Sequence, residues 1–159
     1  MKLLKWIGIS VLVLFLGLQA FSPSKTNPPI DPGRTIQANS QMPPEVLAIL
    51  ERSCSDCHTS NTRWPWYSYV APVSWFVADD VKEARRRLQL SEWSTYPPKK
   101  AAKKLEDMCE EVKDGEMPLK SYLLMHPEAR LSDADKQLLC DWAEQERPRI
   151  LAKQVNDSH

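Results

Sequence analysis

The chain has 159 residues, and its 21 Lys and Arg residues balance 21 Asp and Glu residues, so the formal net charge is zero. This balance argues against a nucleic-acid-binding protein, which would carry a basic excess. The chain has only 4 Gly, three of them within the first 33 residues. Tight hairpin turns and nucleotide-binding loops need glycine, so we expect neither a β-rich body nor a Rossmann or P-loop site.

The N-terminus carries a targeting signal. Lys2 and Lys5 precede an uncharged apolar run from Trp6 to Phe21, and this order is typical of an export signal. The run is longer than most cleavable signals and shorter than most membrane-spanning helices. We therefore predict that residues 1–21 are either a cleaved signal peptide or a retained transmembrane anchor. In both cases the rest of the chain is exported.

Residues 22–43 contain five prolines and no apolar periodicity, which predicts an extended linker. The functional domain then spans residues 44–150, and residues 151–159 form a C-terminal tail.

Four helices are predicted in this domain, each from helical spacing of apolar residues and a start or stop signal. They begin near Pro44, Pro72, Ala101 and Ser132, and they end near Cys57, Leu88, Asp114 and Pro148. Ser132 and Asp135 have the spacing of a capping box. Because no run shows the alternation of a strand, we predict an all-α domain.

The chemistry lies in Cys54-Ser55-Asp56-Cys57-His58, a C-x-x-C-H pattern that is typical of c-type haem attachment. On a helix these three side chains share one face. Two thiols can then bond to the vinyl groups of one porphyrin, and the imidazole can bind its iron. The alternatives are a thioredoxin-like redox pair, a four-thiolate zinc site with the other two cysteines, or a structural disulfide.

Haem iron takes a second axial ligand unless the position stays open for chemistry. Met117 follows a predicted helix stop in a loop that can reach over a haem face, so we predict it as the distal ligand. His126, in the same loop, is the second candidate. Packing alone is the alternative role for each.

Aromatic residues follow the C-x-x-C-H motif. Trp64, Trp66 and Tyr67 can wrap the haem edge and donate hydrogen bonds to its propionates, or they can be ordinary core residues. Arg63 and Arg85 are further candidates for pairing with propionates. We also expect a backbone carbonyl of residues 61–72 to fix the His58 ring.

The run from Val46 to Trp93 and the segment from Gly115 to Trp142 resemble the bacterial haem-binding domain family of exported, cytochrome-c-like proteins. The resemblance covers about residues 44–147 and rests on the C-x-x-C-H, Trp-Pro-Trp-Tyr, Met-Pro and His-Pro elements. It implies a small helical domain around one haem c, held through Cys54, Cys57 and His58. It also supports Met117 as the distal ligand. The export signal in residues 1–21 places the domain in the periplasm in this interpretation.

Cys109 and Cys140 stand on separate predicted helices. In an oxidising compartment two such cysteines favour a disulfide, and the alternative is a pair of buried free thiols.

Two classes of function follow. The first is a monohaem electron carrier with His/Met ligation, served by a haem-attachment machinery and an unidentified redox partner, and tethered to the inner membrane if residues 1–21 are retained. The second is a peroxidase-like enzyme or a gas or redox sensor with a labile distal ligand. A structural or haem-delivery role is a third, weaker possibility. A firm bond from Met117 favours electron transfer over catalysis.

Overall fold

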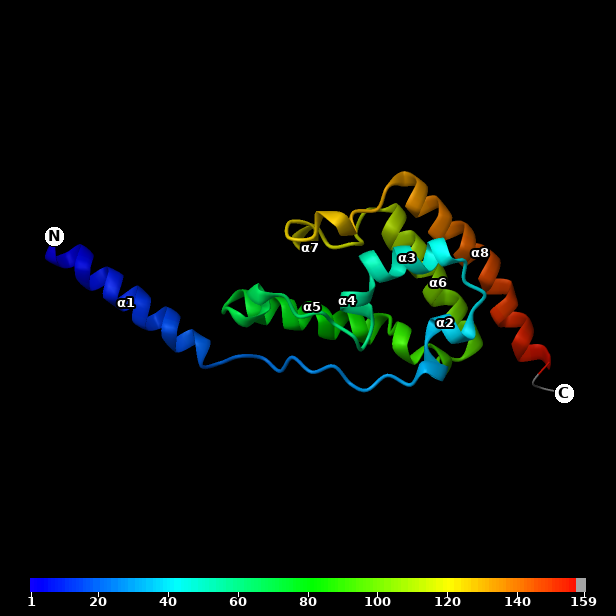
Figure 1. The fold of residues 1–159 in the computed structure, drawn as a ribbon, viewed down its shortest axis with the longest axis horizontal. Helices are drawn as coiled ribbons and strands as arrows, with labels where there is room; N and C mark the ends of the chain where they lie inside the picture. The colour runs from blue at the N-terminus through cyan, green and yellow to red at the C-terminus, as the bar shows by residue number, and fades with distance from the viewer. Residues whose placement is uncertain (157–159) are drawn as a thin grey trace.

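Helices and loops make up the whole of residues 1–156, the part of the chain that the computed structural model describes, with no strand in that range (Figure 1). The predicted all-α class is therefore confirmed. The α-helices are α1 (Lys2–Gln19), α2 (Ile36–Asn39), α3 (Pro44–Ser53), α4 (Ser55–His58), α5 (Val73–Arg87), α6 (Pro98–Lys113), α7 (Lys120–Leu123) and α8 (Asp133–Asn156). The 3-10 helices are η1 (Pro32–Arg34), η2 (Trp66–Tyr69), η3 (Leu90–Thr95) and η4 (Pro127–Ala129).

The first predicted helix is broken at Cys54. Cys54 lies outside the helical region, at φ −125° and ψ −32°, so α3 ends at Ser53 and α4 begins at Ser55. The turn itself is kept, because the Cys54 carbonyl accepts hydrogen bonds from Cys57 N at 3.2 Å and from His58 N at 2.9 Å. The two cysteines and His58 therefore stay on one helical turn.

The fourth predicted helix does not end near Pro148. Helix α8 continues to Asn156 with Pro148 inside it, although proline has no N–H to bond to the carbonyl of Glu144. Burial of Ile150 in the core, with 8% of its surface exposed, favours continuation of the helix beyond the proline. Much of the expected tail is thus helical, and residues 157–159 of that tail lie outside the described residues.

The core lies where α3, α6 and α8 pack together. Val46 of α3, Leu105 and Val112 of α6, and Leu139 of α8 are almost completely buried. Helices α6 and α8 are also joined by a disulfide between Cys109 and Cys140, whose Cα atoms are 5.2 Å apart.

The N-terminus of α8 has the capping box that the sequence predicts. Asp135 N donates to Ser132 Oγ over 3.1 Å, and Ser132 N donates to Asp135 Oδ2 over 2.9 Å. Arg52 of α3 donates to the same carboxylate over 3.1 Å, which connects the two helices.

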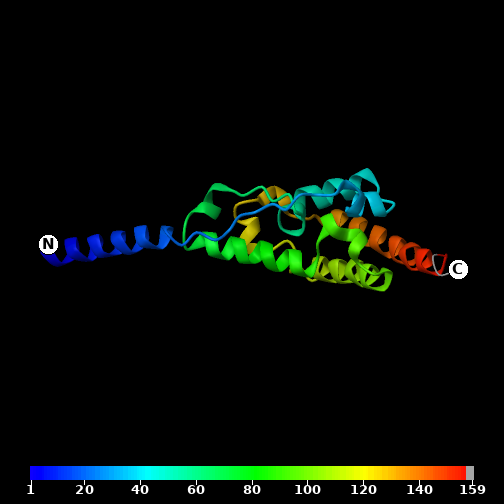
Figure 2. The same ribbon diagram turned by 90° about the horizontal axis from the view of Figure 1, so that it is seen from below.

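Residues 22–43 are not a free linker. They run along the length of the domain (Figure 2), form η1 and α2, and bury Ile36 in the core. Asn27 Nδ2 donates to Thr62 O over 2.9 Å, and Trp142 Nε1 donates to Gln41 O over 2.9 Å. The proline-rich composition gives extended backbone, but side-chain hydrogen bonds fix that backbone to the domain.

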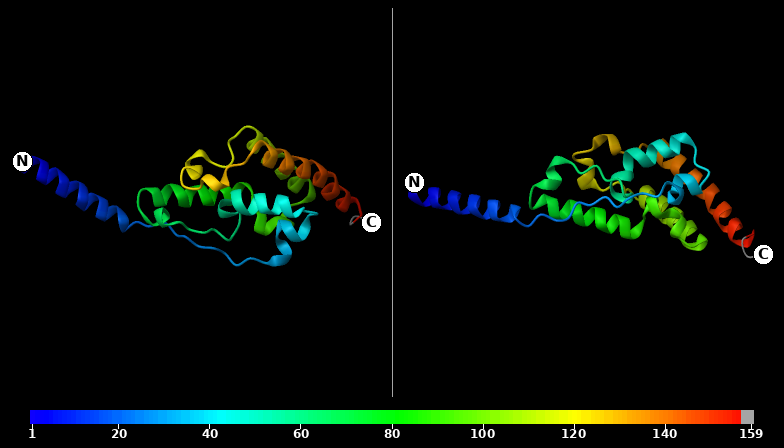
Figure 3. Two further views of the ribbon diagram at one scale, coloured as in Figure 1. Left: turned by 45° about the horizontal axis from the view of Figure 1, so that its top comes forward. Right: turned by 60° about the horizontal axis from the view of Figure 1, so that its bottom comes forward.

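Helix α1 projects from one end of the domain in every view (Figures 1 to 3). None of its side chains is buried. Within the described residues it is the helix that has the length and apolar composition to cross a membrane, features that a signal sequence shares.

Candidate functional site

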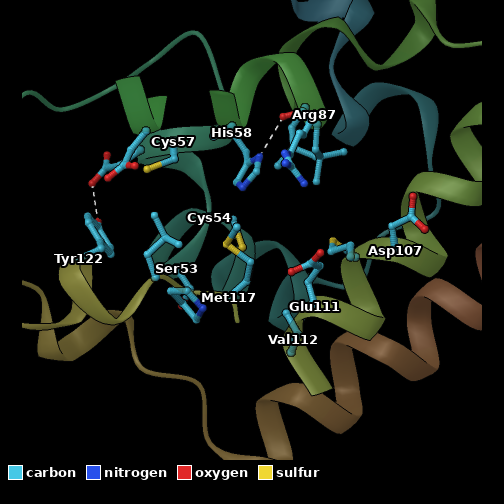
Figure 4. A pocket seen from close by; sticks show the side chains of 18 of the residues that line it. Ser53, Cys54, Cys57, His58, Arg87, Asp107, Glu111, Val112, Met117 and Tyr122 are labelled. Carbon is cyan, nitrogen blue, oxygen red and sulfur yellow. Dashed lines mark hydrogen bonds between the residues drawn. The ribbon is translucent and has the colours of Figure 1, made fainter. Parts of the chain in front are cut away.

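A cavity of about 510 Å³ opens between α4, the last turns of α5, helix α6 and the segment from Met117 to Tyr122. Figure 4 shows Cys54, Cys57, His58, Met117 and Tyr122 around it. Its apolar wall includes Ala84, Leu88, Leu90, Met108, Val112 and Leu131, and charged side chains of α5 and α6 also line the cavity. The volume is in the range of sites that hold a cofactor or a small ligand.

The structure brings both cysteines of the motif to the cavity as free thiols. Burial raises the pKa of Cys54 to about 12 and that of Cys57 to about 11. Both sulfurs are therefore protonated at neutral pH. A reactive redox pair needs a thiolate, and a four-thiolate zinc site would need Cys109 and Cys140, which bond to each other instead. This arrangement therefore disfavours the thioredoxin-like and zinc alternatives.

The His58 ring is held through Nδ1. Its Nδ1 lies 3.0 Å from the carbonyl oxygen of Leu88, and because a carbonyl only accepts, Nδ1 carries the proton. Burial lowers the pKa of His58, so the ring is neutral and Nε2 keeps its lone pair. Such an outer hydrogen bond is the usual support for a histidine that ligates a metal.

The partner of His58 differs from the prediction. We expected a carbonyl from residues 61–72, but the carbonyl comes from Leu88, the residue that caps the C-terminus of α5. Carbonyls in the last turn of a helix have no partner within the helix and are free to accept such a bond.

A network around Asp56 supports the motif. The buried Asp56 carboxylate accepts from Arg63 Nε over 3.0 Å and from Tyr122 Oη over 2.8 Å. Burial and this hydrogen bond raise the pKa of Tyr122 above its ordinary value, so Tyr122 is the donor. Neither Asp56 nor Tyr122 is among the site residues predicted from the sequence. The one available signal was an acid inside the C-x-x-C-H motif followed by Arg63 seven residues later.

Met117 lines the cavity, as its predicted role requires. Helix α6 ends at Lys113, and Gly115 has φ +75°, a left-handed conformation that glycine adopts without strain. Beyond this turn, Met117 N donates to Glu111 O over 3.1 Å, and the side chain packs against the core. Met108 also lines the cavity, but it lies on the buried face of α6.

His126 does not line the cavity. Its Nε2 lies 2.8 Å from Tyr67 Oη, and its Nδ1 lies 3.1 Å from Glu128 Oε1. Its ring stacks on Tyr122, with the centroids 4.3 Å apart. With both nitrogens already engaged, the second candidate for the distal ligand is disfavoured.

The expected aromatic and arginine contacts are not at the cavity wall. Trp64, Trp66 and Tyr67 do not line it, and Trp66 is 71% exposed. Arg63 pairs with Asp56 instead of facing the cavity. Arg85 donates to Thr59 O, Thr26 O, Asn27 Oδ1 and Thr62 Oγ1.

The chemistry of the cavity side chains fits a haem. The neutral imidazole of His58, the thioethers of Met117 and Met108 and two protonated thiols line a cavity with a largely apolar wall. Among the described residues, no group of three or more His, Cys, Asp or Glu side chains could hold a metal ion. Such a set suits iron held within a macrocycle better than a bare ion.

Comparisons with curated proteins and with solved structures gave no match. A family model described as "Haem-binding domain" matches residues 13–145, about four-fifths of the chain. The chain therefore belongs to the haem-binding domain family.

Proposed function

We propose that this haem-binding protein is an exported electron carrier with one haem c. In this proposal the haem is bonded to Cys54 and Cys57, and His58 and Met117 are the axial ligands. The observation that carries the proposal is the neutral His58 ring, held through Nδ1, in the same cavity as two free thiols and Met117.

Each residue has a chemical role in this assignment. A thiol adds across a vinyl group so that sulfur bonds to one carbon and the hydrogen goes to the other. Leu88 O keeps the proton of His58 on Nδ1 and so reserves Nε2 for iron. The bound haem supplies a one-electron couple, and a soft thioether ligand favours the ferrous state and raises its potential.

Electron transfer is favoured over catalysis by the way Met117 is held. Its backbone N–H is bonded to Glu111 O, and its side chain packs against the core. A peroxidase-like enzyme or a sensor would have to release this side chain to open a coordination position. A fixed ligand instead leaves the coordination of the iron unchanged during transfer.

The proposed location follows from α1. Two lysines precede its apolar segment, so its N-terminus would stay in the cytoplasm and the domain would lie in the periplasm. Haem attachment would take place there through a maturation machinery, and a redox partner would exchange electrons with the domain. The inner membrane would hold α1 if the helix is not cleaved.

The test is expression of the full chain together with a haem-maturation system. We expect an intact mass equal to the polypeptide plus one haem, and Soret absorption that survives denaturation and extraction. Replacing both cysteines in C54S/C57S should abolish the mass increment, and Cys140→Ser, outside the motif, should keep it. A polypeptide mass without the increment, and without Soret absorption, would overturn the proposal.

A further inference from the structure

Exposed apolar side chains gather at one end of the domain. We call this set the apolar rim. It consists of Trp66, Tyr69, Val73, Phe76, Leu124 and Met125. Between residues 22 and 152, every large apolar side chain that is more than half exposed belongs to it, from Met125 at 51% to Leu124 at 82%. Exposed apolar residues scattered singly need no explanation, but a cluster of this kind marks a binding surface.

The apolar rim is assembled from segments that are distant in the sequence. Residues of η2 and the start of α5 meet the end of α7, and the hydrogen bond between Tyr67 Oη and His126 Nε2, at 2.8 Å, joins these segments. The ring of Trp66 lies edge-on to Tyr67, with the centroids 5.9 Å apart. The surface is therefore part of the folded domain and not the tip of a loose loop.

The apolar rim lies at the same end of the domain as α1. Figures 1 and 3 show α1 leaving the molecule near the start of α5, at the end of the domain toward which α7 also lies. The last turn of α1 is bonded to this end, because Ala71 N donates to Gln19 Oε1 over 2.9 Å. Just beyond α1, Trp75 Nε1 donates to Phe21 O over 2.6 Å.

Basic side chains stand in the segments that surround the apolar rim. Segments 21–30, 59–78 and 117–127 contain Lys25, Arg63 and Lys120; Arg63 pairs with the Asp56 carboxylate, and Glu128 accepts from His126 at the edge of the apolar rim. Lys25 Nζ lies 4.8 Å from the centre of the Tyr69 ring. Basic side chains beside exposed Trp and Tyr are typical of surfaces that contact lipid headgroups.

We propose that the apolar rim binds the membrane surface, with its aromatic side chains in the headgroup region and the nearby lysines at lipid phosphates. The proposal rests on the proposed function in one respect, that α1 remains in the membrane. A bilayer is the occupant that these observations favour, because α1 would enter it directly beside the apolar rim. Membrane contact would then fix the orientation of the haem cavity relative to the bilayer.

The test uses the full chain, reconstituted in vesicles of phosphatidylethanolamine and phosphatidylglycerol. The photo-crosslinker p-benzoylphenylalanine replaces Phe76 or Tyr69, one at a time. The matched control carries it in place of Leu151, which is 40% exposed and lies near the far end of α8. After irradiation, mass spectrometry measures lipid adducts, vesicle flotation measures insertion of α1, and Soret absorption measures haem.

We expect lipid adducts at positions 76 and 69 and a several-fold lower yield at position 151. Adding Phe76→Asp should lower the yield at position 69 several-fold, and adding Lys136→Asp, near the start of α8, should not. Equal yields at all positions, adducts to a protein instead of lipid, or failure of the chain to float with the vesicles would overturn the proposal. Adducts at the apolar rim of a chain without haem would support the surface and refute the proposed function.

Discussion

Tyr122 Oη donates a hydrogen bond to Asp56 Oδ2 over 2.8 Å, and this bond joins two sides of the cavity. Asp56 lies between the two cysteines of the motif, and Tyr122 lies five residues after Met117. The bond therefore fixes the loop that supplies the proposed distal ligand relative to the turn that supplies the proposed proximal one. Arg63 donates to both oxygens of the same carboxylate.

Removing this hydroxyl group should destabilise the protein. In Tyr122→Phe, a buried carboxylate loses a charge-assisted hydrogen bond, and we expect the free energy of unfolding to fall by about 1.5 kcal/mol. Denaturant unfolding of the full chain in detergent measures this loss. Tyr69→Phe is the matched control, because Tyr69 is 60% exposed, and it should change the free energy little. Equal effects of the two substitutions would contradict the role given to Tyr122.

The ligand assignment is tested at Met117. In Met117→Leu the volume is nearly kept and the thioether is lost. We expect the ferric protein to lose the far-red absorption band of a methionine–iron bond and its reduction potential to fall. Optical titration in a redox buffer measures both properties. Met42→Leu, outside the cavity, should leave the band and the potential unchanged. A far-red band that persists in Met117→Leu would show that Met117 is not the ligand.

Local patterns in the sequence predicted the parts of this protein that depend on neighbouring residues. The capping box at Ser132 and the stop at Gly115 each follow from side chains a few positions apart, and each is found in the structure. The same holds for Met117, since its position in the cavity follows from the turn that ends α6. The C-x-x-C-H motif is also local, because Cys54, Cys57 and His58 lie within five consecutive residues.

What the sequence could not predict depends on distant partners. The carbonyl of Leu88 lies 30 residues from His58, and a backbone acceptor has no side-chain signature. Helix α8 continues past Pro148 because tertiary burial of Ile150 favours it. Trp66 was predicted at the haem, but its exposure depends on how η2 lies against the segment after α7. Composition alone did not distinguish a free linker from one that is bonded to α5.

Arg85 holds the first part of residues 22–43 against the domain. Its guanidinium donates to Thr26 O over 3.0 Å and to Asn27 Oδ1 over 3.1 Å. In Arg85→Ala we expect residues 22–30 to loosen and limited proteolysis within them to become several-fold faster, because cleavage needs local unfolding. Arg86→Ala is the control, since Arg86 bonds only to Glu83 among the described residues. Equal cleavage rates in the two variants would contradict this role.

The disulfide between α6 and α8 should stabilise the folded chain. Cys109 and Cys140 are separated by 31 positions, and closing a loop of that length is worth about 3–4 kcal/mol on the chain-entropy model. We expect C109A/C140A to lose that amount in denaturant unfolding. A reducing agent should destabilise the wild type and leave the variant unchanged. A wild type that reacts with a thiol reagent at these positions before unfolding would contradict the bridge.

The capping box gives the protein an acid-sensitive connection between α3 and α8. The N–H of Ser132, its hydroxyl group and Arg52 hold the pKa of Asp135 below its usual value. The unfolded chain therefore takes up this proton at a higher pH than the folded chain does, and the stabilisation is complete above the unfolded pKa of about 4. It is lost as the pH falls from there through the lower folded pKa. Asp135→Asn should reduce stability by about 1 kcal/mol at neutral pH.

Denaturant unfolding at a series of pH values tests this sign. The difference between wild type and Asp135→Asn should shrink below pH 4 or so, because the wild-type carboxylate is then protonated and resembles the amide. Asp133→Asn is the matched control, since Asp133 lies in the same first turn of α8 without a side-chain hydrogen bond in the described part of the chain. It should give a smaller difference at neutral pH, from the helix dipole alone. A difference for Asp135→Asn that stays constant from neutral pH into the acid range would mean that the carboxylate charge does not stabilise this end of α8.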